Sequence, residues 1–136
     1  MAGGKIEGMV GNFDRDNFIA MLKEHWPDVF ADIDDGSAGL LHLEMATLAR
    51  AVQAAISAED TPLVKKHFKF IDDIFRQSTP EVENAINVSY LENLDFDGRH
   101  AKRIKARELL SPQLHVALRE LEDYLAQIHG TDKPNE

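Results

Sequence analysis

The 136-residue sequence contains no cysteine. A chain without cysteine forms no disulfide, offers no thiolate nucleophile and cannot bind zinc through sulfur. The absence of disulfides suits a reducing compartment.

Long apolar runs are also missing. No stretch approaches the roughly 20 apolar residues that a membrane-spanning helix requires. The opening residues 1–8 lack the apolar segment of a secretion signal. We therefore expect a cytoplasmic protein with no membrane partner.

Motifs for metal binding and catalysis are absent as well. The sequence has no His-Glu-x-x-His, no Glu-x-x-His, no Gly-x-Ser-x-Gly and no phosphate-binding glycine loop. The acidic segment 32–36 resembles a calcium loop, but the frame set by Gly36 places Ala31, Ile33 and His42 where three ligands should stand. We predict no catalytic residue, no metal and no cofactor, and hence a protein that is not an enzyme.

The composition is that of one globular domain, with 43% hydrophobic and 29% charged residues. A chain of this length can bury roughly two-thirds of its unfolded surface without disulfides. We expect one helical domain over residues 12–129, with a flexible N-terminus (1–11) and a flexible C-terminal tail (130–136).

Three sites carry the same helix-start signal, a hydroxyl residue followed by proline. They are Thr61-Pro62, Thr79-Pro80 and Ser111-Pro112. A hydroxyl at the N-cap accepts a backbone N–H, and proline costs little at the first helical position. Each site is expected to place the hydroxyl residue at the N-cap.

Apolar residues recur at helical spacing after these starts and also over residues 14–25 and 40–58. The stripe after Pro112 consists of Leu114, Ala117, Leu118, Leu121, Tyr124, Leu125 and Ile128. We predict a compact all-α, single-domain bundle of five to seven helices. The helices beginning near Pro62, Glu81 and Pro112 should supply most of the core, with the 40–58 helix packed against them.

Residues 81–94 are harder to assign, because their apolar side chains point almost all the way round an α-helical wheel. Either the segment is a central helix touched on several sides, or residues 86–90 form a strand, since apolar and polar residues alternate there. Residues 95–107 have a weak pattern and should form an exposed helix or a loop.

Charge is unevenly distributed along a chain whose net charge is −9. Such a field repels nucleic-acid phosphates and attracts basic proteins. The segment 81–97 combines carboxylates with asparagines on a largely apolar element, which fits a binding surface or an internal hydrogen-bond network. Together with the neighbouring pair on the 62–76 helix, the candidate partner-binding residues are Asp72, Asp73, Glu81, Glu83, Asn84, Asn87, Glu92, Asp95 and Asp97.

Two other features admit a functional and a structural interpretation. The basic run 99–107 could contact phosphates or could neutralise the acidic body, and the lack of interleaved aromatic residues favours neutralisation. His67 could act as an acid, a base or a pH sensor, but its apolar neighbours favour a hydrogen-bonded core histidine.

Two segments carry a resemblance to a known group of proteins. Residues 67–75 (HFKFIDDIF) and 81–94 (EVENAINVSYLENL) resemble a family of small, uncharacterised bacterial helical domains. The similarity extends over about Phe13 to Leu125. Members of that type often occur beside polymorphic toxins, where small acidic proteins serve as immunity factors. The resemblance implies a helical fold and a bacterial origin, and it transfers no functional residues.

The leading hypothesis is a non-catalytic acidic protein that binds and occludes a basic protein partner. It would be an immunity protein that neutralises a toxin such as a nuclease, with carboxylates in place of nucleic-acid phosphates. One alternative is a regulatory module that binds nucleic acid through residues 99–107, although nucleic acid is disfavoured by the charge. The other is a protein that binds a small molecule or a metal through His67, His42 or His115.

Overall fold

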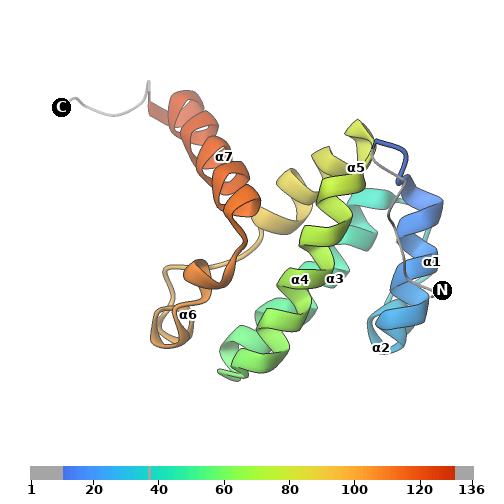
Figure 1. The fold of residues 1–136 in the computed structure, drawn as a ribbon, viewed down its shortest axis with the longest axis horizontal. Helices are drawn as coiled ribbons and strands as arrows, with labels where there is room; N and C mark the ends of the chain where they lie inside the picture. Colours follow the sequence, from blue (N-terminus) through green and yellow to red (C-terminus); the bar gives the residue numbers. More distant parts are fainter. Residues whose placement is uncertain (1–10, 37, 131–136) are drawn as a thin grey trace.

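A computed structural model describes residues 11–36 and 38–130 of the chain (Figure 1). The predicted flexible segments lie almost entirely outside this range. Within it there are seven α-helices, one π-helix, one 3-10 helix and no strand. They are α1 (Arg15–His25), α2 (Pro27–Ala31), α3 (Leu41–Ser57), α4 (Thr61–Gln77), α5 (Pro80–Ala85), the π-helix η1 (Ile86–Leu91), α6 (Arg99–Ile104), the 3-10 helix η2 (Ala106–Leu109) and α7 (Pro112–Gly130). The prediction of a compact all-α domain with five to seven helices is confirmed.

Two of the three predicted helix starts are as expected. The hydroxyls of Thr79 and Ser111 each accept the backbone N–H of the residue three positions later. At α4, however, the N-cap is Asp60 and not Thr61. The Asp60 carboxylate accepts the backbone N–H of Leu63, and a carboxylate at a helix N-terminus is favoured by the helix dipole as well.

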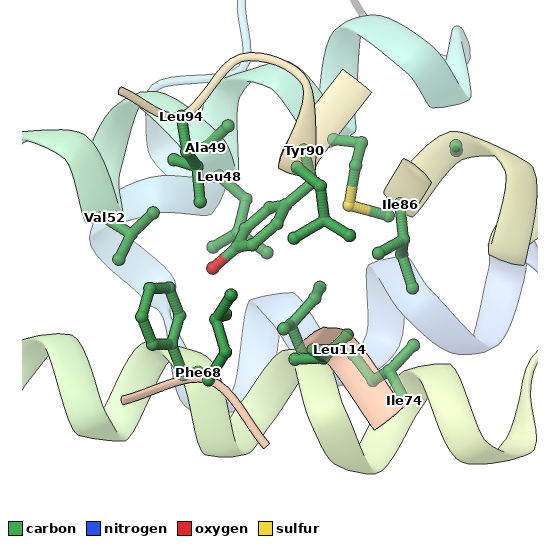
Figure 2. Close-up of a cluster of buried hydrophobic side chains, with 14 of the residues drawn as sticks. Leu48, Ala49, Val52, Phe68, Ile74, Ile86, Tyr90, Leu94 and Leu114 are labelled. Carbon is green, nitrogen blue, oxygen red and sulfur yellow. The ribbon is translucent and has the colours of Figure 1, made fainter. Parts of the chain in front are cut away.

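The core is built around α3, which packs against α4 and η1. Figure 2 shows the apolar face of α3, with Leu48 and Val52, opposite Phe68 of α4, and the side chain of Tyr90 between them. All four side chains are at most 2% exposed. The 40–58 segment, predicted to lie against the core, therefore supplies its centre.

The contribution of α7 to the core is smaller than predicted. Leu114, Ala117 and Leu118 are buried, but Tyr124 is 60% exposed and Ile128 is 47% exposed. Figure 1 shows why: the C-terminal half of α7 extends away from α3 and α4. The apolar stripe of α7 thus continues beyond the body of the domain that it packs against.

The ambiguous segment 81–94 begins as α5 and continues as the π-helix η1. The wider turn is marked by a hydrogen bond from the N–H of Glu92 to the carbonyl of Asn87, five residues earlier. A wheel drawn at α-helical spacing cannot place side chains correctly on such a segment. The helical alternative is confirmed, and the alternative of a strand over residues 86–90 is wrong.

The weakly patterned residues 95–107 form a short loop, the helix α6 and the first part of η2. Lys105 joins the two helices in the left-handed conformation, with φ 58°. Both alternatives offered for this segment, helix and loop, are therefore realised in part.

A partly buried ion pair between Arg15 and Glu44 joins α1 to α3. Glu44 is 1% exposed, and its carboxylate accepts hydrogen bonds from Arg15 (Nε to Oε1, 2.9 Å) and from the backbone of Gly39 (2.7 Å). Burial acts to raise the pKa of Glu44, but the bonds from Arg15 and Gly39 outweigh it, and the pKa lies below its ordinary value. Glu44 is consequently held as a carboxylate.

No helix in the described ranges is long and apolar enough to cross a membrane.

Candidate functional site

Four of the predicted partner-binding residues lie on the consecutive elements α5 and η1. Glu81 and Glu83 are exposed in the first turn of α5. Asn84 and Asn87 follow on the same stretch of chain and line a groove against α7. The structure therefore brings the asparagines to a surface hollow, with two carboxylates at the start of the same helix.

This hollow, which we call the α7 groove, has a volume of about 350 Å³. It is lined by Asn84, Asn87 and Val88 on one side and by Ala117, Glu120, Leu121 and Tyr124 on the other. Val88 is 43% exposed and faces the same groove as the 60% exposed Tyr124. Exposed apolar side chains on both walls, together with amides and a carboxylate, are typical of protein-interaction surfaces.

Asn87 adds a polar group to this groove. Its side-chain oxygen Oδ1 is buried and has no hydrogen-bond partner within the part of the chain that the structure describes. Most buried side-chain oxygens are hydrogen-bonded, so this unpaired acceptor is an exception that the fold itself does not satisfy. The internal network that was the alternative explanation for the asparagines accounts for Asn93, whose Nδ2 donates to the Ser89 carbonyl at 2.8 Å.

Asp72, another predicted partner-binding residue, is used within the fold. It accepts hydrogen bonds from Ser111 Oγ, Gln113 Nε2 and Arg76 Nη2 at 2.5–2.8 Å. Burial acts to raise the pKa of Asp72, but these three bonds outweigh it, and the pKa lies below its ordinary value. Asp72 therefore joins α4 to the beginning of α7. Its neighbour Asp73 is 38% exposed and pairs with Lys69 at 3.0 Å.

Asp95 also has an internal role. Its Oδ1 accepts the backbone N–H groups of Asp97 and Gly98, both at 3.0 Å. A Cβ at Gly98 would lie 2.6 Å from the Asp95 carboxylate, so a larger residue there would force this side chain to move. Glu92 and Asp97 are exposed and line a smaller hollow that also includes Arg107.

The basic run 99–107 makes several contacts with acidic side chains. His100 Nδ1 lies 2.8 Å from Glu59 Oε2, and Arg103 lies 3.5 Å from the same oxygen. The hydrogen bond with His100 is the main reason why the pKa of Glu59 is lowered. Arg107 donates two hydrogen bonds to Glu122 on α7. These pairs are the intramolecular neutralisation that the sequence favoured.

The histidines named in the small-molecule hypothesis lie on separate elements. His42 on α3 is 2.7 Å from Ser89 Oγ, His67 is on α4, and His115 is on α7. Across residues 11–36 and 38–130, no group of three or more His, Asp or Glu side chains is arranged to hold a metal ion. The structure thus offers these three residues no shared metal centre.

His67 is buried, at 3% exposure, as expected of a core histidine. Its ring stacks on the indole of Trp26, with the centroids 3.9 Å apart and the planes 17° apart. Burial, and then the positive charge of Lys66, lower the pKa of His67 to about 4. The expected hydrogen bond is not made at Nδ1, which has no partner among the described residues.

A second hollow lies between α1 and α4, beside the Trp26–His67 stack. It has a volume of about 200 Å³. We call it the Trp26 cavity; it is lined by Met21, His25, Trp26, Lys66, Lys69, Phe70, Asp73 and Ile74. Of the predicted partner-binding residues, only Asp73 lines it.

Sequence reasoning missed both the α7 groove and the Trp26 cavity. The amphipathic stripe of α7 identified its apolar face, but such a stripe does not show where the covering body ends. A clue existed in its length, since seven apolar positions over 114–128 exceed what a small core readily covers. No local signal placed Trp26 next to His67, because the two are 41 positions apart.

One family comparison is positive. The model of a domain of unknown function (DUF7674) matches residues 19–126 of the chain. The match contains both segments that carried the resemblance, 67–75 and 81–94, and an uncharacterised small-domain family is thereby confirmed. No curated protein and no solved structure matches the chain.

Proposed function

This chain belongs to the DUF7674 family of domains of unknown function, and we propose that it is a non-catalytic domain that binds a basic protein in the α7 groove. The observation that supports this most directly is the exposure of Val88 and Tyr124 on opposite walls of one groove. Tyrosine is among the residues that contribute most to protein–protein binding energy.

The charge around the groove indicates the kind of partner. Glu120 lines the groove, and Glu81 and Glu83 are exposed on the helix that leads into it. The whole chain has a net charge of −9. An apolar centre with acidic surroundings favours a partner that presents an apolar side chain within a basic surface.

The mechanism we propose is occlusion. The carboxylates of Glu81, Glu83 and Glu120 would occupy cationic sites that the partner uses for phosphates, and the apolar contact with Tyr124 would slow dissociation. A bacterial toxin such as a nuclease has the required cationic surface, which is consistent with the immunity role that the resemblance suggested. In this proposal Asp72 and Asp95 act indirectly, because they hold the fold that presents the groove.

Binding of nucleic acid through residues 99–107 is the less favoured alternative. His100, Arg103 and Arg107 already contact Glu59 or Glu122. A phosphate would have to displace these carboxylates. The observations therefore favour a protein partner over a nucleic acid.

Site-specific photocrosslinking in the native host tests the proposal. A photoreactive phenylalanine analogue is placed at Val88 or at Tyr124, and at the exposed Ala54 of α3 as a matched control. We expect one basic protein to crosslink at both groove positions and not at the control. Its affinity for the purified domain should fall with added salt and on the double change Glu81→Gln, Glu83→Gln.

Three results would contradict the proposal. They are crosslinking of an acidic protein, equal crosslinking at Ala54, and an affinity that neither salt nor the double change alters. The immunity role makes a further demand, namely that the captured protein is toxic when expressed alone and loses its activity when the domain is bound.

A further inference from the structure

The Trp26 cavity shares no lining residue with the α7 groove. Its volume of about 200 Å³ can be compared with the apolar cavity of about 150 Å³ that is known to take up benzene. A ligand of one or two rings is therefore of suitable size.

The cavity is lined by aromatic and apolar side chains. The ring centroids of Trp26 and Phe70 are 5.9 Å apart, and the two rings meet edge to face with 73° between their planes. Met21 and Ile74 complete the apolar lining. Behind the indole, the imidazole of His67 is uncharged at neutral pH, since its pKa is lowered to about 4. Such a lining favours a flat, apolar ligand body.

The polar side chains of the cavity include two lysines. Lys69 pairs with Asp73, which lines the same cavity, so their charges compensate each other. The ammonium group of Lys66 lies 4.9 Å from the centroid of the Trp26 ring. Within the described residues Lys66 has no carboxylate partner, so it can pair with an anion. His25, also in the lining, lies 4.0 Å from Glu24.

A further observation concerns the indole nitrogen. Trp26 is 8% exposed, and its Nε1 donor is buried without a hydrogen-bond partner in the described part of the chain. Most buried donors have a hydrogen-bond acceptor, so a buried donor without one is rare. This donor is not exposed at the cavity surface, so a ligand acceptor could reach it only after the cavity lining moves.

From the size of the cavity, its apolar walls and the charge of Lys66, we infer that the Trp26 cavity binds a small aromatic carboxylate of one or two rings. The ring lies against Phe70 and the indole, and the carboxylate pairs with Lys66. This site is independent of the proposed protein partner and would give the domain a small-molecule ligand of its own.

The sequence has a single tryptophan, so its fluorescence reports on this cavity alone. The full chain is titrated with 4-fluorobenzoate while tryptophan fluorescence and the ligand ¹⁹F NMR signal are followed. We expect saturable binding with a Kd of about 1 mM or tighter, in line with the size of the ligand. The uncharged analogue 4-fluorobenzyl alcohol should bind about tenfold more weakly, because it cannot pair with Lys66.

A pair of adjacent lysines gives a matched control. Lys66 lines the cavity, whereas Lys65, which is also exposed, does not. Lys66→Gln should weaken binding of 4-fluorobenzoate about tenfold, and Lys65→Gln should change it by less than about twofold. Both changes are on the surface and should leave the fold intact.

Three outcomes would overturn the inference. The first is the absence of saturable binding up to about 20 mM, far above the affinity expected of a site of this size. The second is equal binding of the acid and the alcohol. The third is equal weakening by the two lysine changes. Crosslinking at Val88 and Tyr124 does not depend on any of these, so the two proposals can fail separately.

Discussion

The imidazole of His67 lies flat against the indole of Trp26, with ring centroids 3.9 Å apart. The contact joins α4 to the residue that links α1 with α2, and it encloses an ionisable ring in the core. Burial of the ring in this contact disfavours the charged form of the histidine.

Stability should therefore depend on pH through His67. The pKa of His67 is about 4 in the folded chain, against an ordinary value of 6.5, so the unfolded chain binds the proton more tightly. The contribution is fully present above pH 6.5 and is lost as the pH falls toward 4, by up to about 3 kcal/mol. Urea unfolding at several pH values in this window measures it.

The matched variant for this prediction is His67→Phe, which keeps a flat ring against Trp26 and removes the titration. As the pH falls from 6.5 toward 4, the unfolding free energy of the wild type should decrease relative to that of the variant. Parallel pH profiles would show that His67 does not titrate in the expected range.

Breaking the partly buried ion pair between Glu44 and Arg15 should destabilise the domain. Glu44→Gln removes the charge that Arg15 requires, at a site that is 1% exposed. Arg15 itself is 32% exposed and can be partly rehydrated, so the expected loss is about 2 kcal/mol, below the value for a fully buried pair. Asp16→Asn serves as the control, because Asp16 is 89% exposed and contacts the same arginine. Equal unfolding free energies for the two variants would refute this role of Glu44.

The loop before α6 should not accept a methyl group at Gly98. The added Cβ would displace the Asp95 carboxylate and disrupt its bonds to two backbone N–H groups. We expect Gly98→Ala to lower the unfolding free energy by about 1–2 kcal/mol. Gly36→Ala is the comparison, since its Cβ would meet Asp34 at an ordinary 3.5 Å. Thermal unfolding of both variants decides, and similar melting temperatures would contradict the prediction.

The groove side chains should matter for binding and hardly for folding. Tyr124→Ser changes a residue that is 60% exposed and should alter stability by less than about 0.5 kcal/mol. It should weaken binding of the crosslinked partner at least about tenfold. Leu114→Ala on the same helix should instead lower the unfolding free energy by about 2–4 kcal/mol, because Leu114 is fully buried. Calorimetry gives the affinity and urea unfolding the stability; undiminished binding by the Tyr124 variant would contradict the role of the groove.

The sequence predicted the helices whose local signals agree with their surroundings. At α3 and α4 the apolar spacing alone identified the buried face, because both helices are packed along most of their length. At the start of α4 the signal was misassigned by one residue, since Asp60 and Thr61 are both good capping residues and only the backbone geometry decides between them.

Other features depend on contacts between distant parts of the chain. The π-helical turn at 86–91 has no sequence signature of its own, and it appeared only as an irregular distribution of apolar residues. The internal roles of Asp72 and Asp95 depend on partners such as Gln113 and Gly98, and only the second of these is close in sequence. The sequence therefore located these acidic side chains near an apolar segment, but it did not show that Asp72 and Asp95 serve the fold.

The π-helix has a consequence for how the domain can evolve. The hydrogen bond from Glu92 to Asn87 joins residues five positions apart, whereas an α-helical hydrogen bond joins residues four positions apart. The π-helical turn therefore holds one extra residue. Deleting one residue between 86 and 91 would allow α5 to continue as an ordinary helix and would rotate everything after it by about 100°. Chain length at this point therefore sets which side chains face the core where the chain leaves η1.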